Sequence, residues 1–262
     1  MKKEIVNVMI VAALCFSTYA AAQTSTNKKV NNATCSVSES VCINNNTTVG
    51  EMAVNEPKSI KLYKRLGIDY CCLGNKNLKE ALSEKKITPE IFTEKLELLK
   101  KEPDVKPVVN YTAMTPEALA GYIENTHHEY LRESLPEASA LFEKVLRVHG
   151  DNHPELYEAY KLFGALKTNL EQHLIKEETQ LFPKIEDLNN PEVKEIAAGA
   201  KEEHEEVAEL MEKLRGVAHD YVLLQDACAS YKSLYTSLQA IEEDLHQHIH
   251  LENNILLKNI DV

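Results

Sequence analysis

The chain has 262 residues, of which 44% are hydrophobic and 27% are charged, a balance typical of a globular protein with a substantial core. The formal net charge of −12 at pH 7 repels phosphate groups, so we expect no nucleic-acid partner. Long stretches rich in Glu, Lys, Leu and Ala, with only 8 Gly and 9 Pro, predict an all-α protein.

The first residues have the pattern of a secretion signal. Lys2 and Lys3 give a basic start, an apolar run follows over residues 8–16, and three alanines at 20–22 form a small-residue cleavage pattern. The apolar run is too short to anchor the chain in a bilayer, so we do not expect an integral membrane protein. We therefore predict a signal peptide over residues 1–22 and export to the periplasm.

The next segment, residues 23–47, is rich in Asn, Thr and Ser and poor in apolar residues, which predicts a flexible linker. It contains Cys35 and Cys42, which can pair in an oxidising compartment or remain as two unpaired thiols. A further cysteine, Cys228, has no predicted role.

Residues 48–105 are predicted to form a small helical domain that contains two adjacent cysteines. Gly67 is in the usual position for closing a helix that runs from residue 57 to residue 66. Thr88 predicts the start of another helix, because it is an N-cap residue followed by Pro89 in the first turn.

Four long helical patterns follow, which predict an up-down-up-down four-helix bundle over residues 112–260. The expected helices cover residues 115–148, 154–182, 190–219 and 226–258. Pro136 lies inside the first of them and is expected to kink or restart that helix.

Polar residues interrupt the apolar faces of three of these helices. The second helix has apolar residues at steps of three or four, namely Leu156, Tyr160, Phe163, Leu166 and Leu170, and this series continues to His173 and Glu177. The fourth helix has the series Tyr231, Leu234, Leu238, Ile241 and Leu245, which continues to His248 and Glu252. In the third helix, His204 is on the same face as Val207. Burying unpaired charges costs several kcal/mol at least, so these faces predict a compensating metal ion.

The spacing of these residues is repeated, which indicates two similar helical hairpins. Each histidine four residues before a glutamate shares a helix face with it, about 6 Å away. The distance in sequence from His128 to His173 nearly equals that from His204 to His248, which favours His128 as the ligand of the first helix. The apolar stripe of that helix instead places His127 closer to the core, so the residues alone leave both candidates open. Glu178 is a rival of Glu177 but is one residue off the face.

Four histidines and two glutamates suit two metal ions that share both carboxylates. Imidazole and carboxylate ligands in a bundle core are typical of iron or manganese. Zinc is disfavoured, because thiolates are absent and six ligands are too many for one tetrahedral ion. A bridging oxide or hydroxide would leave one open position on each metal for O2, nitric oxide, peroxide or water. The remaining histidines are predicted at the surface or behind the ligands: His149, His153, His219, His246 and His250.

Several segments carry a resemblance to a known family. The small domain contains LGIDYCCLGNKNLKEAL, and the bundle contains HHEYLRESLPE, HLIKEETQLFP, EEHEE and HIHLENN. Together these segments resemble the iron–sulfur cluster repair di-iron proteins, also called repair of iron centres proteins, over residues 48–258. The register of the first bundle segment assigns its ligand to His128 rather than His127. Leu73 stands where the family usually has Gly.

The resemblance implies a hemerythrin-like bundle that holds two non-haem iron ions, bridged by oxide or hydroxide. The implied ligands are His128, His173, Glu177, His204, His248 and Glu252. It also implies repair of iron–sulfur clusters damaged by nitrosative or oxidative stress, through iron donation, nitric oxide processing or both. Cys71 and Cys72 would be redox or transfer thiols in that reaction.

The implied partners are damaged iron–sulfur proteins or iron acceptors, with nitric oxide, O2 or peroxide as small ligands, and the chain is expected as a monomer or homodimer. The family is typically cytoplasmic, which is the alternative to export. We expect no established enzyme class, with nitric oxide or peroxide reduction as the enzymatic candidate. The alternative function is a hemerythrin-like O2 or nitric oxide binder or sensor without turnover. Hemerythrins usually use more histidines, and a cysteine pair has no use in such a binder, so repair is preferred.

Overall fold

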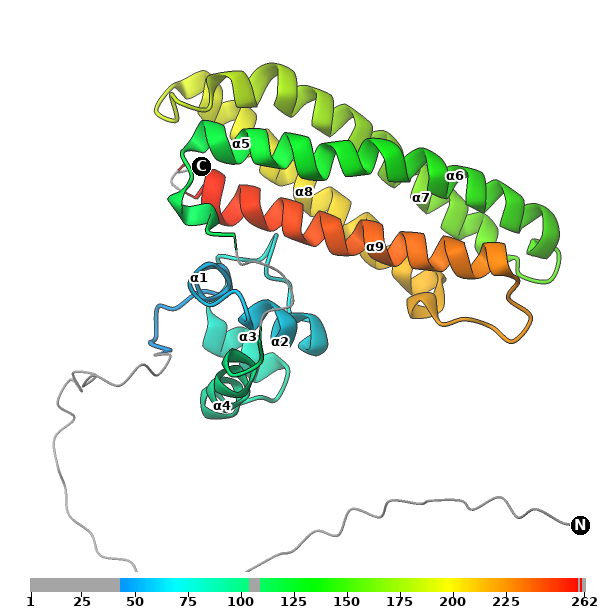
Figure 1. Ribbon diagram of the computed structural model, residues 1–262, viewed down its shortest axis with the longest axis horizontal. Helices are drawn as coiled ribbons and strands as arrows, with labels where there is room; N and C mark the ends of the chain where they lie inside the picture. The colour runs from blue at the N-terminus through cyan, green and yellow to red at the C-terminus, as the bar shows by residue number, and fades with distance from the viewer. Residues whose placement is uncertain (1–42, 104–108, 259, 261–262) are drawn as a thin grey trace, which may run out of the picture. The chain divides into compact units, whose positions relative to one another are not determined.

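The computed structural model describes residues 43–103, 109–258 and 260 (Figure 1). The predicted signal peptide lies outside these residues, as do Cys35 and Cys42. Within the described ranges the regular elements are helices, apart from one isolated bridge between Thr48 and Asn77, which confirms the all-α prediction. None of the described helices is long and apolar enough to cross a membrane.

Four short helices form the first part of the described chain. They are α1 (Val49–Asn55), α2 (Ser59–Leu66), α3 (Leu78–Glu84) and α4 (Pro89–Lys100). The predicted stop and start signals are confirmed, because Gly67 closes α2 with a left-handed φ of 61° and the Thr88 side chain caps α4. Buried apolar side chains, including Tyr63 and Phe92, give these helices a core of their own.

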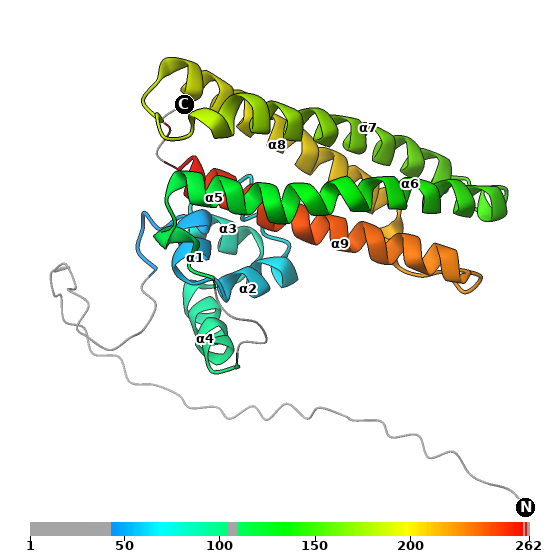
Figure 2. The same ribbon diagram turned by 45° about the horizontal axis from the view of Figure 1, so that its top comes forward.

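The second part is the helical bundle, in which α6 packs against α9 and α7 packs against α8 (Figure 2). Its α-helices are α5 (Pro116–Ile123), α6 (Glu129–His149), α7 (Glu155–Lys176), α8 (Pro191–Val217) and α9 (Ala229–Leu251). A 3-10 turn, η1 (Tyr111–Ala113), precedes α5, and two others, η4 (Phe182–Lys184) and η5 (His219–Tyr221), lie before and after α8. Thr115 and Asn190 cap α5 and α8 through their side chains, as their positions before Pro predict.

The apolar stripes read from the sequence form the core of the bundle. Phe163, Leu234 and Leu245 are completely buried, and Tyr160 is half-buried and packs against the same cluster. Full burial of one such aliphatic or aromatic side chain contributes about 1.5–3 kcal/mol, so these stripes account for much of the cohesion between the helices.

Three π-helical turns interrupt the bundle helices, and the sequence analysis did not predict them. They are η2 (Glu124–His128), η3 (Glu177–Leu181) and η6 (Glu252–Leu256). The first helix was expected to kink or restart at Pro136, but α6 continues through this residue, so a restart there is wrong. The buried neighbours Leu135 and Ala138 hold the chain in the core on both sides of the proline.

Candidate metal centre

Three of the six residues of the candidate site lie at the π turns. His128 is the last residue of η2, Glu177 is the first residue of η3, and Glu252 is the first residue of η6. The other three, His173, His204 and His248, lie within the regular helices α7, α8 and α9. A π turn inserts one residue into a helix and is frequently found at functional sites, because it alters which side chains share a face.

Six predicted residues come together as two overlapping groups of potential ligands. One group consists of His128, Glu177, His248 and Glu252, and the other consists of His173, Glu177, His204 and Glu252. The ligand atoms within each group lie within 4.8 Å of one another, and every one of these residues is buried. Because both glutamates belong to both groups, the geometry suits two metal ions joined by two carboxylates.

The histidine nitrogens of each group lie unusually close together. Nε2 of His128 is 3.2 Å from Nε2 of His248, and Nε2 of His173 is 3.1 Å from Nε2 of His204. Neighbouring ligand atoms on one ion, bonded at about 2.1 Å each, are separated by about this distance. The nearest carboxylate contacts are similar, since Nε2 of His204 and of His248 each lie 3.0 Å from an oxygen of Glu252.

The buried carboxylate of Glu177 tests whether these residues fit a metal. Neither of its two oxygens has a hydrogen-bond partner among the described residues, although the side chain is only 1% exposed. A buried carboxylate without hydrogen bonds is expensive, because it has lost its hydration, and the histidine nitrogens beside it, Nε2 of His173 and of His128, lie 3.3 and 3.5 Å from one of its oxygens. Cations held between the histidines and this carboxylate would supply the missing interaction, so the donor set fits the metal that the sequence predicts.

Burial and close packing shift the pKa values of the metal-free cluster in both directions. Burial and repulsion from Glu252 raise the pKa of Glu177 to about 8. Burial and the nearby His248 lower the pKa of His128 to about 4. Burial opposes a charged His204, but the hydrogen bond to Glu252, the charges of both glutamates and the contact with Asn253 together outweigh it and raise the pKa of His204 to about 9. In the absence of metal, therefore, protons occupy part of the cluster.

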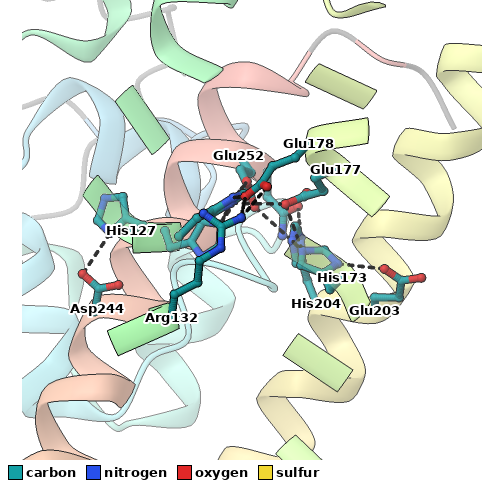
Figure 3. Close-up of polar contacts among 12 residues, drawn as sticks. His127, Arg132, His173, Glu177, Glu178, Glu203, His204, Asp244 and Glu252 are labelled. Carbon is teal, nitrogen blue, oxygen red and sulfur yellow. Dashed lines mark hydrogen bonds and ion pairs between the residues drawn. The ribbon is translucent and has the colours of Figure 1, made fainter. Parts of the chain in front are cut away.

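Acidic residues behind the ligands orient two of the histidine rings. Nδ1 of His173 lies 2.7 Å from Glu203, which also forms an ion pair with Lys176 (Figure 3). Nδ1 of His128 lies 2.7 Å from Glu178, which is paired with Arg132. These contacts turn each Nε2 toward the centre of the cluster, as the outer partners of metal-bound histidines commonly do.

Most of these supporting residues were not predicted from the sequence. Glu203 and Arg132 lie on polar faces of their helices and read as ordinary surface charges. The only available signal was their position, since Glu203 directly precedes His204 and Arg132 lies one turn after His128. Glu178, the sequence rival of Glu177, lies behind His128 and is in neither ligand group.

His127 lies beside the cluster and belongs to neither ligand group. Its Nδ1 is 2.9 Å from an oxygen of Asp244, and Figure 3 shows the ring turned toward that residue. Its ring stacks on His248 with 5.7 Å between centroids. The structure therefore places the two adjacent histidines in different environments, with His128 among the potential ligands.

The adjacent cysteines are held by an aspartate that precedes them. The backbone N–H groups of Cys71 and Cys72 each donate to Oδ1 of Asp69 at 2.9 Å. The two sulfur atoms are 3.8 Å apart, and both cysteines are free thiols. The hydrogen bond with Cys72, together with burial, raises the pKa of the Cys71 thiol.

An asparagine links this cysteine loop to one ligand group. Asn253 Nδ2 donates to the carbonyl oxygen of Cys71 at 3.2 Å, while its Oδ1 lies 2.9 Å from Nδ1 of His204. The Cys72 thiol also lies 3.5 Å from the carbonyl oxygen of His204. Two contacts therefore connect the cysteine pair with the same histidine.

The next asparagine, Asn254, is packed so closely that its neighbours must be glycine. Its Nδ2 donates to the carbonyl oxygen of Tyr70 at 3.0 Å. A Cβ atom on Gly50 would lie 2.3 Å from Oδ1 of Asn254, and one on Gly74 would lie 2.0 Å from it. Any larger residue at these glycines would force the Asn254 side chain to shift from the position in which it donates to Tyr70.

The remaining histidines differ in their surroundings. His219 is exposed, as predicted. His250 is buried and contacts Tyr70 and Asn254. His149 was expected at the surface or behind the ligands, and this prediction is wrong, because its side chain is buried against Tyr231 at the opposite end of α6 from His128.

The fold and the cluster define a class of metal-binding helical bundles, and comparisons with known proteins agree. The family model described as the hemerythrin HHE cation binding domain matches residues 122–260, and the ScdA N-terminal domain, a domain of unknown function, matches residues 45–100. The iron–sulfur cluster repair protein ScdA of Staphylococcus haemolyticus is 29% identical over 218 residues, which cover 82% of this chain and 97% of the relative.

A second group of relatives carries the name iron–sulfur cluster repair protein YtfE. The protein from Pectobacterium carotovorum is 30% identical over 209 residues, covering 80% of this chain and 94% of its own. One from Escherichia coli is 29% identical over 208 residues, which cover 79% of this chain and 93% of the relative. The chain therefore belongs to the hemerythrin-like family of iron–sulfur cluster repair proteins. Membership of the hemerythrin family implies binding of non-haem iron.

Proposed function

We propose that this protein repairs iron–sulfur clusters damaged by nitrosative or oxidative stress and uses a di-iron centre to do so. One iron would be held by His128 and His248 and the other by His173 and His204. Glu177 and Glu252 would bridge the two. When bound, such a pair supplies redox-active metal that can bind small molecules such as nitric oxide, O2 or peroxide.

The observation that carries this proposal is the sharing of both glutamates by the two ligand groups. A single metal ion would leave at least two of the four clustered histidines without a role. The unsatisfied oxygens of Glu177 further support a centre that is completed only by cations. Two relatives that align with this chain over 97% and 94% of their own length carry the name iron–sulfur cluster repair protein, which supports the choice of substrate.

The cysteine pair supports a repair role over simple storage or sensing of a gas. Cys72 is half-buried and lies against His204, while Cys71 is buried and retains its proton. In this proposal the two thiols bind or exchange iron, or accept oxidising equivalents, at a point directly beside the centre. A carrier that only binds O2 or nitric oxide has no need of them.

The proposed site of action depends on the N-terminal segment. The signal-like pattern over residues 1–22 predicts export, and the alternative location is the cytoplasm. Fractionation of cells that produce the full chain distinguishes the two. A processed protein in the periplasmic fraction would support export, and an unprocessed protein in the cytoplasm would exclude it.

A repair assay tests the function directly. A [4Fe–4S] dehydratase is inactivated with nitric oxide and then incubated with iron-loaded protein, and recovered dehydratase activity is measured. We expect recovery with the wild type, little recovery with the double variant Cys71→Ser, Cys72→Ser, and unchanged iron content in that variant. Equal recovery with the double variant would show that the thiols have no part in repair. Absence of recovery with the wild type would contradict the proposed function.

A further inference from the structure

A second cluster of metal-type ligands lies far from the candidate di-iron centre. It consists of His149, His153 and Asp226, whose potential ligand atoms all lie within 4.8 Å of one another. His149 ends α6, whereas His128 directly precedes it, and the 21 residues of that helix span about 30 Å. Figure 1 shows the turn between α6 and α7 and the loop that enters α9 at the same end of the bundle.

The backbone presents the two histidines from successive turns. The N–H of His153 donates to the carbonyl oxygen of His149 at 2.8 Å, so the chain continues one helical turn beyond the end of α6. Gly150 makes this turn possible, since a Cβ atom there would lie 2.5 Å from the carbonyl oxygen of Leu146. The two imidazole rings are thereby brought to 6.0 Å between centroids.

His153 is already oriented as a metal ligand would be. Its Nδ1 lies 3.1 Å from Glu155, which fixes the ring, and its Nε2 lies 2.9 Å from Oδ2 of Asp226. A carboxylate on the far nitrogen of a ligand histidine is the usual way such a ring is held. The 2.9 Å between Nε2 and Oδ2 is a hydrogen-bond distance, and two atoms bonded at about 2.1 Å to one tetrahedral ion would be about 3.4 Å apart.

His149 supplies the observation that an ordinary ion pair does not explain. Its side chain is only 6% exposed, and its Nε2 is buried with no hydrogen-bond partner in the described part of the chain. A salt bridge between His153 and the two carboxylates would be complete without His149. A buried imidazole left unsatisfied beside this pair is destabilising unless something else engages it.

We propose that His149, His153 and Asp226 form a second metal site that binds one Zn²⁺ ion. Two imidazoles and one carboxylate, with the fourth position open to water, form a common zinc ligand set. Binding requires Nε2 of His153 and Oδ2 of Asp226 to move apart by about 0.5 Å, and Asp226 can make this movement, because its side chain is 54% exposed and lies in a loop. The site is independent of the proposed repair function and of iron.

Equilibrium dialysis of the iron-loaded full-length protein against Zn²⁺ tests the site, with iron and zinc measured together by metal analysis. We expect one zinc per chain that is absent from Asp226→Asn and from His153→Gln, with unchanged iron in all three proteins. Glu155→Gln should weaken zinc binding about 10- to 100-fold, because it removes the group that orients His153. His219→Asn is the matched control, an exposed histidine at the same end of the bundle, and should bind zinc as the wild type does.

The comparison isolates this site from other zinc ligands. Zinc bound by Asp69, Cys71 and Cys72 would persist in both variants, so only the difference from the wild type counts. Thermal unfolding provides a second readout, since added Zn²⁺ should raise the Tm of the wild type and leave that of Asp226→Asn unchanged. Equal zinc content in the wild type and both variants would overturn the proposal. So would zinc uptake by the wild type only in exchange for iron.

Discussion

Individual residues carry the connection between the thiols and the candidate metal centre. The side-chain oxygen Oδ1 of Asn253 accepts a hydrogen bond from Nδ1 of His204, and its Nδ2 donates one to the carbonyl oxygen of Cys71. It follows Glu252 directly in sequence, so one short segment provides a potential ligand and the contact that orients a second ligand. A change in the cysteine loop would therefore act on the position of His204.

Replacing Asn253 separates these two contacts. We expect Asn253→Ala to weaken iron binding about 10- to 100-fold, because His204 loses the group that holds its ring. Asn253→Asp is the matched control, because it retains the acceptor for His204 and loses the donor to Cys71. It should bind iron nearly as well as the wild type. Competition for iron with a chelator measures both variants, and equal weakening in the two would show that the contact with Cys71, not that with His204, matters.

Residue patterns reveal the potential ligands because these interrupt faces that are otherwise apolar. His173 and Glu177 continue the series that ends at Leu170, and such an interruption is visible in the sequence. The supporting residues Glu203 and Asn253 interrupt nothing, since polar residues are common on the solvent side of a helix. Their role depends on the distance between helices, which the pattern of one helix does not contain.

At the scale of elements, the π turns contain three of the potential ligands, His128, Glu177 and Glu252. The turn η3 begins at Glu177, and its exposed residue Thr179 donates a side-chain hydrogen bond to the carbonyl oxygen of Ile175 at 2.6 Å. Helix starts were predictable because a capping residue followed by Pro has a local cause. A π turn was not predictable, because one inserted residue changes the spacing of apolar residues by less than that spacing ordinarily varies along a helix.

Deleting Thr179 tests whether the π turn is needed. We expect the shortened segment to form a regular α-helix and to turn Glu177 relative to Leu181, so that iron content falls while the helical content is kept. Thr179→Ala is the control, because it removes the side-chain hydrogen bond and keeps the length of the segment. Iron analysis and circular dichroism measure the outcome. Full iron content after the deletion would show that the centre tolerates a regular helix at this position.

For the whole molecule, the buried cluster makes the metal-free fold sensitive to pH. The pKa of Glu177 is raised from 4.5 to about 8, chiefly by burial, and that of His204 is raised from 6.5 to about 9. Between about pH 7 and pH 9 the folded chain therefore binds more protons at these groups than the unfolded chain does. Groups whose pKa is lowered in the folded chain, such as His128 with a pKa of about 4, titrate below pH 7.

The free energy of unfolding of the metal-free protein should consequently fall between pH 7 and pH 9. Urea unfolding at the two pH values measures it. Glu177→Gln should reduce the fall, because its side chain does not titrate, and the stabilisation by bound iron should grow as protons leave the cluster. A metal-free protein equally stable at both values would mean that these groups do not hold protons in the folded state.

Long-range packing limited what the sequence could predict about the molecule as a whole. The burial of His149 and the close approach of Asn254 to Gly50 and Gly74 depend on residues far apart in the chain. The fold class and most of the potential ligands were predictable because each rests on the periodicity of single helices, whereas His128 was distinguished from His127 only by the family resemblance. The contact of the cysteine loop with His204 was not, since it joins two segments that share no pattern.

Iron stoichiometry tests the central claim most directly. The full-length protein is reconstituted with Fe²⁺ under anaerobic conditions, freed of unbound metal and analysed for iron, alongside Glu177→Leu and Glu252→Leu. Glu171→Leu, at an exposed position of α7, is the control. We predict about two iron ions per chain in the wild type and the control, and a marked loss in both ligand variants, which should remain helical. Iron-free wild-type protein, or full iron content in both ligand variants, would contradict the proposed di-iron centre.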